Sequence, residues 1–540
     1  MSTGAGRLGD FNAERESIVA EVEQRILAER RAAHLRGGDG RLEYVLNDAA
    51  FHETQRLEKG SPEERKRAAR WHELARDLSR MSDAEKEAEA ARLTHEHARD
   101  VAGNFDARVY GFVKNILPVG MSLLLTPQRL REGLGNLGEL QGRVLIEGEL
   151  DTVRALAARG TLVVTPTHLS NMDSIVIGFA LERAGLPPCT YGAGKNLFTN
   201  PILSFFMRNL GAYRVDRRLR HSLYKDVLKE YSTVLIERGF HSLFFPGGTR
   251  SRSGGLEQKL KLGLMGTGLR AYENRLAAGA QGLSVFFVPV TLNYHLTLEA
   301  ETLIDDYLAE VGKSRYIIED DESSRFGRVT SFIRKTLAME GATVVRFGQP
   351  LDPFGNQVDA EGQSHDPRGR RIDPELFLDD GASGRGPVTQ RDNEYTRTLG
   401  ESIVKAYQRD VVYMATHLVA TVLWERMCAQ AGVRDPFRVL RMADPQQVSS
   451  ELLAAGVDRL RDRIRGANGA WGRLDKRSAE RPAMGVVDDA LRSFTAYHSR
   501  PVAERRGGAV VPTSLRLVYY YRNRMAHLPD AAVAGLGGLS

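Results

Sequence analysis

The stretch TLVVTPTHLSNMD occupies residues 161–173 and decides which fold class the sequence predicts. Its first five residues are apolar or β-branched, and a short continuous run of this kind is typical of a strand buried on both faces. Polar residues, among them His168 and Asp173, follow the run directly. We therefore expect a strand over 161–165, a loop that carries His168, and a helix that begins near Asp173.

Similar runs recur on both sides of this stretch, at 144–146, 242–245, 285–288 and 342–347. Helical patterns of about 10 to 20 residues separate most of these runs, for example over 224–238 and 262–276. Apolar strands that alternate with helices indicate an α/β fold, with a sheet covered on both faces by flanking helices.

The composition divides the chain into four parts. Residues 1–104 are rich in interleaved Glu, Arg, Ala and Leu, which predicts amphipathic helices, one of them starting at Ser61-Pro62. Residues 105–353 form the α/β domain. Residues 354–396 are rich in Gly, Asp and Arg and predict a polar loop or linker. Helical patterns return from 397 and predict a C-terminal helical region over 397–540.

The bulk properties limit the partners and the compartment. A net charge of +6 and a pI near 9.2 favour polyanionic partners such as phosphates, nucleic acid or an anionic lipid surface. No helix-turn-helix, zinc finger, RRM or basic groove with interleaved aromatic residues supports nucleic acid among them. Cys189 and Cys428 are the only cysteines, which excludes a disulfide framework and a zinc cluster and predicts a cytoplasmic protein.

No segment reaches the roughly 18 to 20 apolar residues of a membrane span. The segments 109–125 and 200–210 come nearest, and either could dip into an interface without crossing it. Basic residues over 208–225 adjoin the apolar run 201–207. This arrangement predicts peripheral association with the anionic cytoplasmic face of a membrane.

His168 and Asp173 carry the clearest chemical signal. A carboxylate at the start of a helix can accept a hydrogen bond from one nitrogen of a histidine in the preceding loop. The other nitrogen is then free to take a proton from a substrate hydroxyl, so an H-x4-D spacing fits a general base for an alcohol. Ligands of α/β folds gather at this end of the strands.

Three further segments follow. An extended segment over 211–218 ends in Arg217 and Arg218, which could bind a phosphate, although an exposed basic turn is the alternative. The sequence PGGTRSRSGG at 246–255 places Gly248, Thr249, Arg250 and Arg252 in a loop after a strand, where backbone N–H groups and guanidinium groups could surround an anion. Lys261 lies just downstream. The segment 288–294 is expected to shape the pocket wall.

In this order and spacing, the four segments resemble the four motifs of the glycerolipid acyltransferase superfamily. The segments 193–197, 210–217, 223–231 and 250–254 are similar to its glycerol-3-phosphate and dihydroxyacetone-phosphate acyltransferase branch. The run YYRNRMAHL at 520–528 is similar to a C-terminal run of the bacterial membrane-associated glycerol-3-phosphate acyltransferases. The resemblance covers 110–350 well and 397–528 loosely, and it implies a central mixed sheet.

The resemblance also implies roles. His168 would be the general base, Asp173 its orienting partner, and Arg217, Arg250 and Arg252 contacts of the acceptor phosphate, with Lys261 at a position that is often basic. The acceptor hydroxyl of glycerol 3-phosphate would attack an acyl thioester directly. The thioester, of CoA or acyl-carrier protein, is a co-substrate, and no metal or prosthetic group is implied.

One position departs from the family pattern, because Gly247 stands where the family has Glu. The acceptor could therefore be lysophosphatidate or dihydroxyacetone phosphate instead, and a non-catalytic lipid-binding relative is a further alternative. The acyl chain length, the choice of thioester, the oligomeric state and the role of the N-terminal helices stay open at this point.

Overall fold

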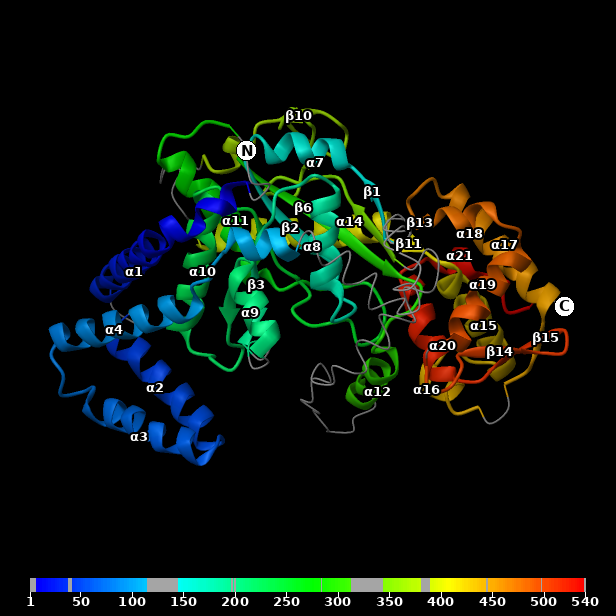
Figure 1. Cartoon of the computed structure of the whole chain (residues 1–540), viewed down its shortest axis with the longest axis horizontal. Coiled ribbons are helices and arrows are strands. Elements are labelled where there is room, and N and C mark those ends of the chain that lie inside the picture. Colours follow the sequence, from blue (N-terminus) through cyan, green and yellow to red (C-terminus); the bar gives the residue numbers. More distant parts are fainter. Residues whose placement is uncertain are drawn as a thin grey trace.

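The computed structural model describes residues 6–36, 41–113, 144–195, 198, 201–282, 284–311, 343–379, 389–442, 445–496 and 498–538. A seven-stranded sheet lies at its centre, between the N-terminal helices and the C-terminal region (Figure 1). The strand order is β1 (Val144–Gly148), β7 (Thr343–Phe347), β6 (Val285–Tyr294), β2 (Thr161–Pro166), β5 (Ser242–Leu243), β3 (Thr190–Gly194) and β4 (Ala212–Val215).

Neighbouring strands of this sheet are parallel except β6 and β7, which are antiparallel. The predicted α/β fold with a central mixed sheet is therefore confirmed. Because β2, β3, β4, β5 and β6 run in one direction, the loops after them meet at one edge of the sheet. All four of the segments identified in the sequence lie in or after these strands.

Helices cover both faces of the sheet. Alternate residues of a strand point to opposite faces, and in the central strands both sets of side chains are apolar. Leu162 and Val164 belong to a core shared with the helices of one face. Val163 belongs to a core shared with the helices of the other face. These helices are α7 (Leu150–Ala157) and α8 (Asp173–Arg183) on the first face, and α10 (Ser222–Glu237), α11 (Leu262–Ala277) and α14 (Thr389–Asp410) on the second.

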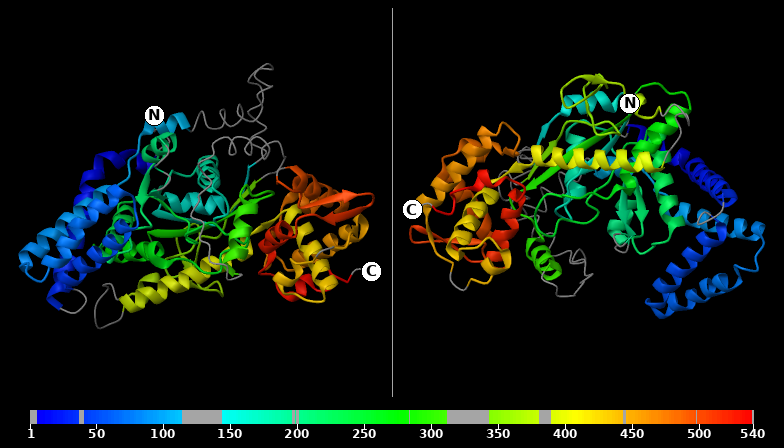
Figure 2. Two further views of the ribbon diagram at one scale, coloured as in Figure 1. Left: turned by 90° about the horizontal axis from the view of Figure 1, so that it is seen from below. Right: turned by 180° about the vertical axis from the view of Figure 1, so that it is seen from behind.

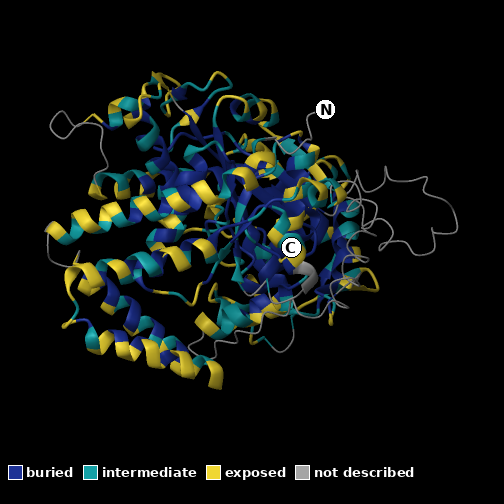
Figure 3. Ribbon diagram, turned by 60° about the vertical axis from the view of Figure 1, so that its left-hand side comes forward, coloured by how far each residue is buried: buried dark blue, intermediate teal, exposed yellow. Residues whose placement is uncertain are grey.

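The described residues of the N-terminal region form four longer helices and a short 3₁₀ turn. Helix α3 begins as the sequence predicts, with Ser61 as cap, Pro62 first, and Glu64 completing a capping box. The apolar sides of these helices share one core with α10 and with Tyr213 of β4, while exposed residues lie on the outer helix surfaces (Figure 3). The elements are η1 (Gly6–Asp10), α1 (Phe11–Arg36), α2 (Leu42–Glu58), α3 (Pro62–Asp77) and α4 (Asp83–Val101).

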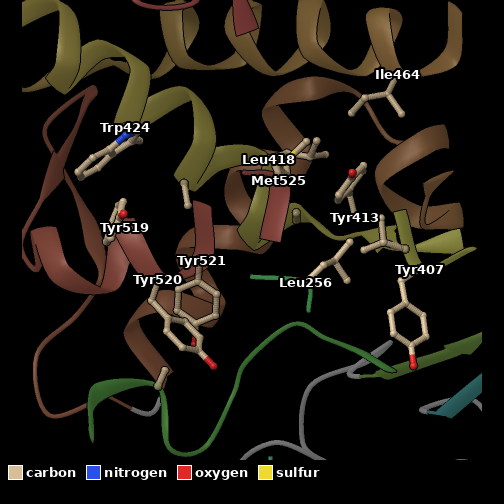
Figure 4. Close-up of a cluster of buried hydrophobic side chains, with 14 of the residues drawn as sticks. Leu256, Tyr407, Tyr413, Leu418, Trp424, Ile464, Tyr519, Tyr520, Tyr521 and Met525 are labelled. Atoms are coloured by element: carbon tan, nitrogen blue, oxygen red, sulfur yellow. The ribbon is translucent and has the colours of Figure 1, made fainter. Parts of the chain in front are cut away.

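The C-terminal region packs around an aromatic cluster that includes Tyr413, Trp424, Tyr519, Tyr520 and Tyr521 (Figure 4). It contains short strands besides the helices that the sequence predicts. Its elements are β11 (Val412–Tyr413), α15 (Ala415–Ala431), α16 (Pro436–Val439), β12 (Val448–Ser449), α17 (Ser450–Gly466), β13 (Arg473–Leu474), α18 (Lys476–Glu480), α19 (Ala483–Ala496), β14 (Ala503–Arg506), β15 (Ala509–Pro512), α20 (Leu515–Arg522), η7 (Asn523–Met525) and α21 (Asp530–Val533).

Three details differ from the sequence prediction. Helix α14 begins at Thr389 rather than near 397, and it lies along the sheet, against α11 and β6 (Figure 2). The preceding polar stretch contains the short elements β8 (Gln357–Val358), β9 (Ser364–His365), β10 (Arg371–Ile372) and η6 (Pro374–Phe377). Strand β3 was not predicted, because its sequence TYGAG contains two glycines.

The described helices include none with the length and apolar character that a membrane crossing requires. Of the two candidate interfacial segments, 109–125 lies mostly outside the described residues. The other forms α9 (Pro201–Asn209), on which the side chain of Phe205 is exposed. Helix α12 (Ala300–Val311) follows β6 and packs against α20 of the C-terminal region.

Candidate active site

His168 and Asp173 form a hydrogen-bonded pair at the end of β2. Asp173 is the first residue of α8, and its side chain is completely buried. Its Oδ2 lies 2.7 Å from Nδ1 of His168, and it also accepts the backbone N–H groups of Leu169 at 2.6 Å and Ser170 at 2.9 Å. Because a carboxylate can only accept, Nδ1 of His168 carries the hydrogen and Nε2 is left as the basic nitrogen.

Tyr294, the last residue of β6, completes the environment of the carboxylate. Its hydroxyl donates to Oδ1 of Asp173 at 2.5 Å. Burial, together with the neighbouring charge of Asp173, raises the pKa of Tyr294 well above its ordinary value, so the phenol keeps its proton and remains a donor. Both oxygens of Asp173 are thus hydrogen-bonded, which holds the carboxylate in one orientation toward His168.

The imidazole of His168 is also held from its other sides. The ring of Phe245 stacks on it at a centroid distance of 4.2 Å and an interplanar angle of 24°. The carbonyl oxygen of His168 accepts the N–H of Ser251 at 2.7 Å, and its own N–H donates to Oε1 of Glu257 at 2.7 Å. The segment from Phe245 to Glu257 therefore contacts His168 through its ring and through both backbone groups.

A buried carboxylate joins the histidine loop to the arginine loop. Oε1 of Glu299 accepts the N–H of Asn171 at 2.9 Å and pairs with Nη1 of Arg250 at 3.2 Å. Its Oε2 accepts the hydroxyl of Ser170 at 3.0 Å. Burial raises the pKa of Glu299, and these donors and the charge of Arg250 oppose that shift. The predicted site residue Arg250 is therefore placed next to the His168 loop.

The other predicted residues of the glycine-rich loop lie around Arg250. Gly248 has φ of +77°, and a Cβ on it would lie 2.6 Å from Cδ of Lys261, so the lysine stem covers this glycine. Lys261 itself precedes α11, and its N–H donates to the carbonyl of Pro246 at 2.8 Å. Thr249 is exposed. Arg252 pairs with Glu310 of α12 at 2.8 Å.

Arg217 lies apart from these residues. It is exposed, and it follows β4, which is separated from β2 by β5 and β3. The neighbouring Asp216 pairs with Arg218 at 3.1 Å. No contact between Arg217 and the His168 loop occurs among the described residues, so Arg217 shares only the edge of the sheet with the other candidates.

The C-terminal region also contacts the loop after β5 and the end of β6. The side-chain amide of Asn523 donates to the carbonyl of Ser253 at 2.9 Å. Arg524, which is 1% exposed, donates from Nη2 to the carbonyl of Leu292 at 2.7 Å and to Oδ1 of Asn293 at 3.0 Å. The run 520–528, singled out in the sequence, therefore supports the loop after β5 and the end of β6.

Sequence reasoning missed Tyr294, Glu299 and Glu257. The segment 288–294 was expected to shape the pocket wall, and the polar residue that ends its apolar strand was the available signal for Tyr294. Glu299 follows the same strand by a few residues, at the edge where the loops meet. Nothing in the sequence around Glu257 pointed to the site.

Residues 148–293 match the family model described as Acyltransferase. The chain carries an acyltransferase domain. The match includes β2, His168, Asp173 and the arginine loop. The resemblance predicted from the ordered segments is confirmed.

Two curated relatives are both described as glycerol-3-phosphate acyltransferase. The one from Xanthomonas campestris is 28% identical over 50% of this chain and 27% of its own length. The one from Actinobacillus succinogenes is 29% identical over 55% of this chain and 34% of its own length. The chain thus spans about a third or less of the length of these relatives.

Among solved structures, one of those similar to part of this chain is an acyltransferase. It is the crystal structure of the 1-acyl-sn-glycerophosphate (LPA) acyltransferase PlsC from Thermotoga maritima. The two share 15% sequence identity and a TM-score of 0.25, over 49% of this chain and 72% of that one.

Proposed function

We propose that the chain transfers a fatty acyl group from a thioester to the sn-1 hydroxyl of glycerol 3-phosphate. Nε2 of His168 takes the hydroxyl proton as the oxygen attacks the thioester carbonyl carbon. The ester C–O bond forms, the C–S bond breaks, and the imidazolium gives its proton to the leaving thiolate. Asp173 stabilises the imidazolium that exists between these steps.

The observation that carries this proposal is the His168–Asp173 pair and its position. The 2.7 Å contact fixes which imidazole nitrogen is basic, and it lies at the edge where the loops after the parallel strands meet. Arg250 reaches the same loop through Glu299. A base for a hydroxyl and a cation for an anionic group are therefore adjacent, as a phosphorylated alcohol requires.

For the acceptor phosphate we propose the arginine loop. Arg250 and Arg252 supply guanidinium groups, Gly248 and Thr249 supply the loop backbone, and Lys261 adds a further charge. Arg217 would reach the acceptor only from the outer part of the same edge. The donor in this proposal is acyl-CoA or acyl-carrier protein, and no step in it uses a metal.

A membrane surface is the proposed location, at the cytoplasmic side. Phe205 is 53% exposed on α9, and the nearby Arg208, Arg217 and Arg220 are exposed. Each exposed basic residue contributes about 1 kcal/mol of attraction to an anionic surface. We expect co-sedimentation with anionic but not neutral vesicles, reduced by salt. Phe205→Ser should weaken it and Leu376→Ser, an exposed apolar residue elsewhere, should not; salt-insensitive binding would contradict this placement.

The deciding experiment is transfer from long-chain acyl-CoA, and separately from acyl-carrier protein, to labelled glycerol 3-phosphate in anionic vesicles. His168→Ala should lower kcat about 10²- to 10⁴-fold. His72→Ala, which changes an exposed histidine of α3, is the control and should have no effect. Transfer only to lysophosphatidate or dihydroxyacetone phosphate would change the assigned acceptor. Thioester binding without His168-dependent transfer to any acceptor would favour a non-catalytic relative.

A further inference from the structure

Glu257 is a buried acid that touches the candidate base through its backbone, and the mechanism above does not use it. Its Oε1 accepts the N–H of His168 at 2.7 Å. Its Oε2 is buried and has no hydrogen-bond partner among the described residues. A buried carboxylate costs free energy unless it is paired, so its presence here needs a reason.

The position of Gly247 explains how this carboxylate reaches His168. A Cβ on Gly247 would lie 2.9 Å from Cγ and 3.3 Å from Oε1 of Glu257. Real Cβ atoms essentially never approach a neighbour that closely, so the glutamate side chain occupies the space that a side chain at 247 would fill. The absence of a side chain at 247 and the presence of a carboxylate at 257 are therefore two parts of one arrangement.

The surroundings hold this carboxylate in place. Burial raises the pKa of Glu257, and the N–H of His168 and the positive charge of Arg524 act in the opposite direction. Leu256, the preceding residue, is buried in the core of the C-terminal region (Figure 4). The next fixed point along the chain is the bond from Lys261 N–H to the carbonyl of Pro246. Glu257 is thus held between two anchored residues.

From these contacts we infer that Glu257 is a positioning residue, which holds the backbone of His168 so that the imidazole stays between Phe245 and Asp173. The carboxylate of Glu257 fits next to His168 because Gly247 has no side chain. This inference rests on the proposed function, because the value of a positioned imidazole is its role as a base. Glu257 itself touches no substrate in this mechanism.

Three single variants separate positioning from stability. Glu257→Gln keeps an oxygen that can accept the N–H of His168. Its kcat should therefore stay within about threefold of the unmutated value. Glu257→Leu has similar bulk without an acceptor and should lower kcat about 10- to 100-fold, with the KM for glycerol 3-phosphate nearly unchanged. Gly247→Ala should displace Glu257 and lower kcat in the same way. All assays are run well below each variant's Tm.

A relocation variant gives the sharpest result. Glu257→Ala should lower kcat as much as Glu257→Leu does. Gly247→Glu combined with Glu257→Ala returns a carboxylate to the same space, and its kcat should be about tenfold higher than that of Glu257→Ala alone. Equal kcat in Glu257→Leu and the unmutated chain would overturn the inference. So would a relocation variant no better than Glu257→Ala, because the carboxylate would then have no positional role.

The imidazole signal of His168 in nitrogen-15 NMR spectra distinguishes a failed inference from a failed function. If the unmutated chain transfers acyl groups but the variants do not differ, only the inference fails. If the unmutated chain transfers acyl groups to no acceptor, the proposed function fails. The NMR signal of His168 then tests only whether Glu257 positions the imidazole. A signal that moves in Glu257→Leu but not in Glu257→Gln supports the positioning; one unchanged in both refutes it.

Discussion

Replacement of Tyr294 by Phe removes a single hydroxyl next to the His168–Asp173 pair. That hydroxyl donates to Oδ1 of Asp173 at 2.5 Å, and no other partner of Oδ1 occurs among the described residues. Asp173 is completely buried, so water cannot replace the lost donor without a rearrangement. The variant therefore leaves one oxygen of a buried carboxylate unpaired.

The size of the effect follows from the charge on that carboxylate. A hydrogen bond to a charged group contributes about 1.5 to 3 kcal/mol. We expect the free energy of unfolding to fall by about that amount. If the whole loss is also felt in the transition state, kcat falls about 10- to 100-fold, because about 1.4 kcal/mol corresponds to a factor of ten. KM should change little, since Tyr294 contacts Asp173 and not the substrate in our mechanism.

Tyr231→Phe is a matched control. Its hydroxyl is also buried and accepts one hydrogen bond, from the N–H of Gly103 at 3.0 Å, in the core shared by α10 and the N-terminal helices. This variant should lose stability without losing kcat in the acyl-transfer assay. In an Asp173→Asn background, Tyr294→Phe should cause little further loss, because the hydroxyl acts through the carboxylate. Unchanged kcat in Tyr294→Phe, or a full additional loss in that background, would refute the reasoning.

Three further outcomes are expected. Glu299→Gln weakens the charge-assisted contacts between the histidine and arginine loops and should lower kcat/KM about tenfold, measured by varying glycerol 3-phosphate; an unchanged value would contradict this role. Gly254→Ala places a Cβ 2.5 Å from a backbone carbonyl of α20, so its Tm should fall more than that of Gly239→Ala, where φ is also positive but nothing lies within 4 Å. Burial lowers the pKa values of His97 and His221 to about 4, from 6.5. The stability that each neutral imidazole contributes, about 3 kcal/mol, is complete above about pH 6.5 and is lost as pH falls toward 4. The free energy of unfolding, measured by chemical denaturation, should therefore differ less between pH 7 and pH 5 in His221→Asn than in the unmutated chain. Asparagine is the chosen replacement because it can still cap the helix.

The sheet and its helices were predictable because their signals are local. The run 161–165 alternates its side chains between two apolar cores, and the period of α11 places its apolar side on one face of the sheet. Strand β3 escaped prediction for a physical reason. A Cβ at Gly192 would make a tight contact of 3.1 Å with the ring of Tyr213 on β4. Glycine at this position also removes the β-branched signal that marks a strand.

The candidate site was predictable only in part, because its supports are distant in sequence. His168 and Asp173 are five residues apart and their spacing is a local pattern. Tyr294 lies 121 residues from Asp173, Glu299 lies 129 from Ser170, and Glu257 lies 89 from His168. No spacing rule connects such residues. Their contacts follow from the order of β2, β5 and β6 in the sheet, which the sequence alone did not supply.

Two of these supports lie outside the matched acyltransferase segment, which therefore does not contain the whole candidate site. The family match ends at residue 293, one position before Tyr294, and it excludes Glu299. The C-terminal region adds Arg524, whose fully buried side chain bonds the end of β6 at Leu292 and Asn293. Because Tyr294 follows these two residues directly, the C-terminal region holds the strand end that presents the hydroxyl to Asp173. The geometry of the His168–Asp173 pair therefore depends on segments that extend almost to the end of the described chain.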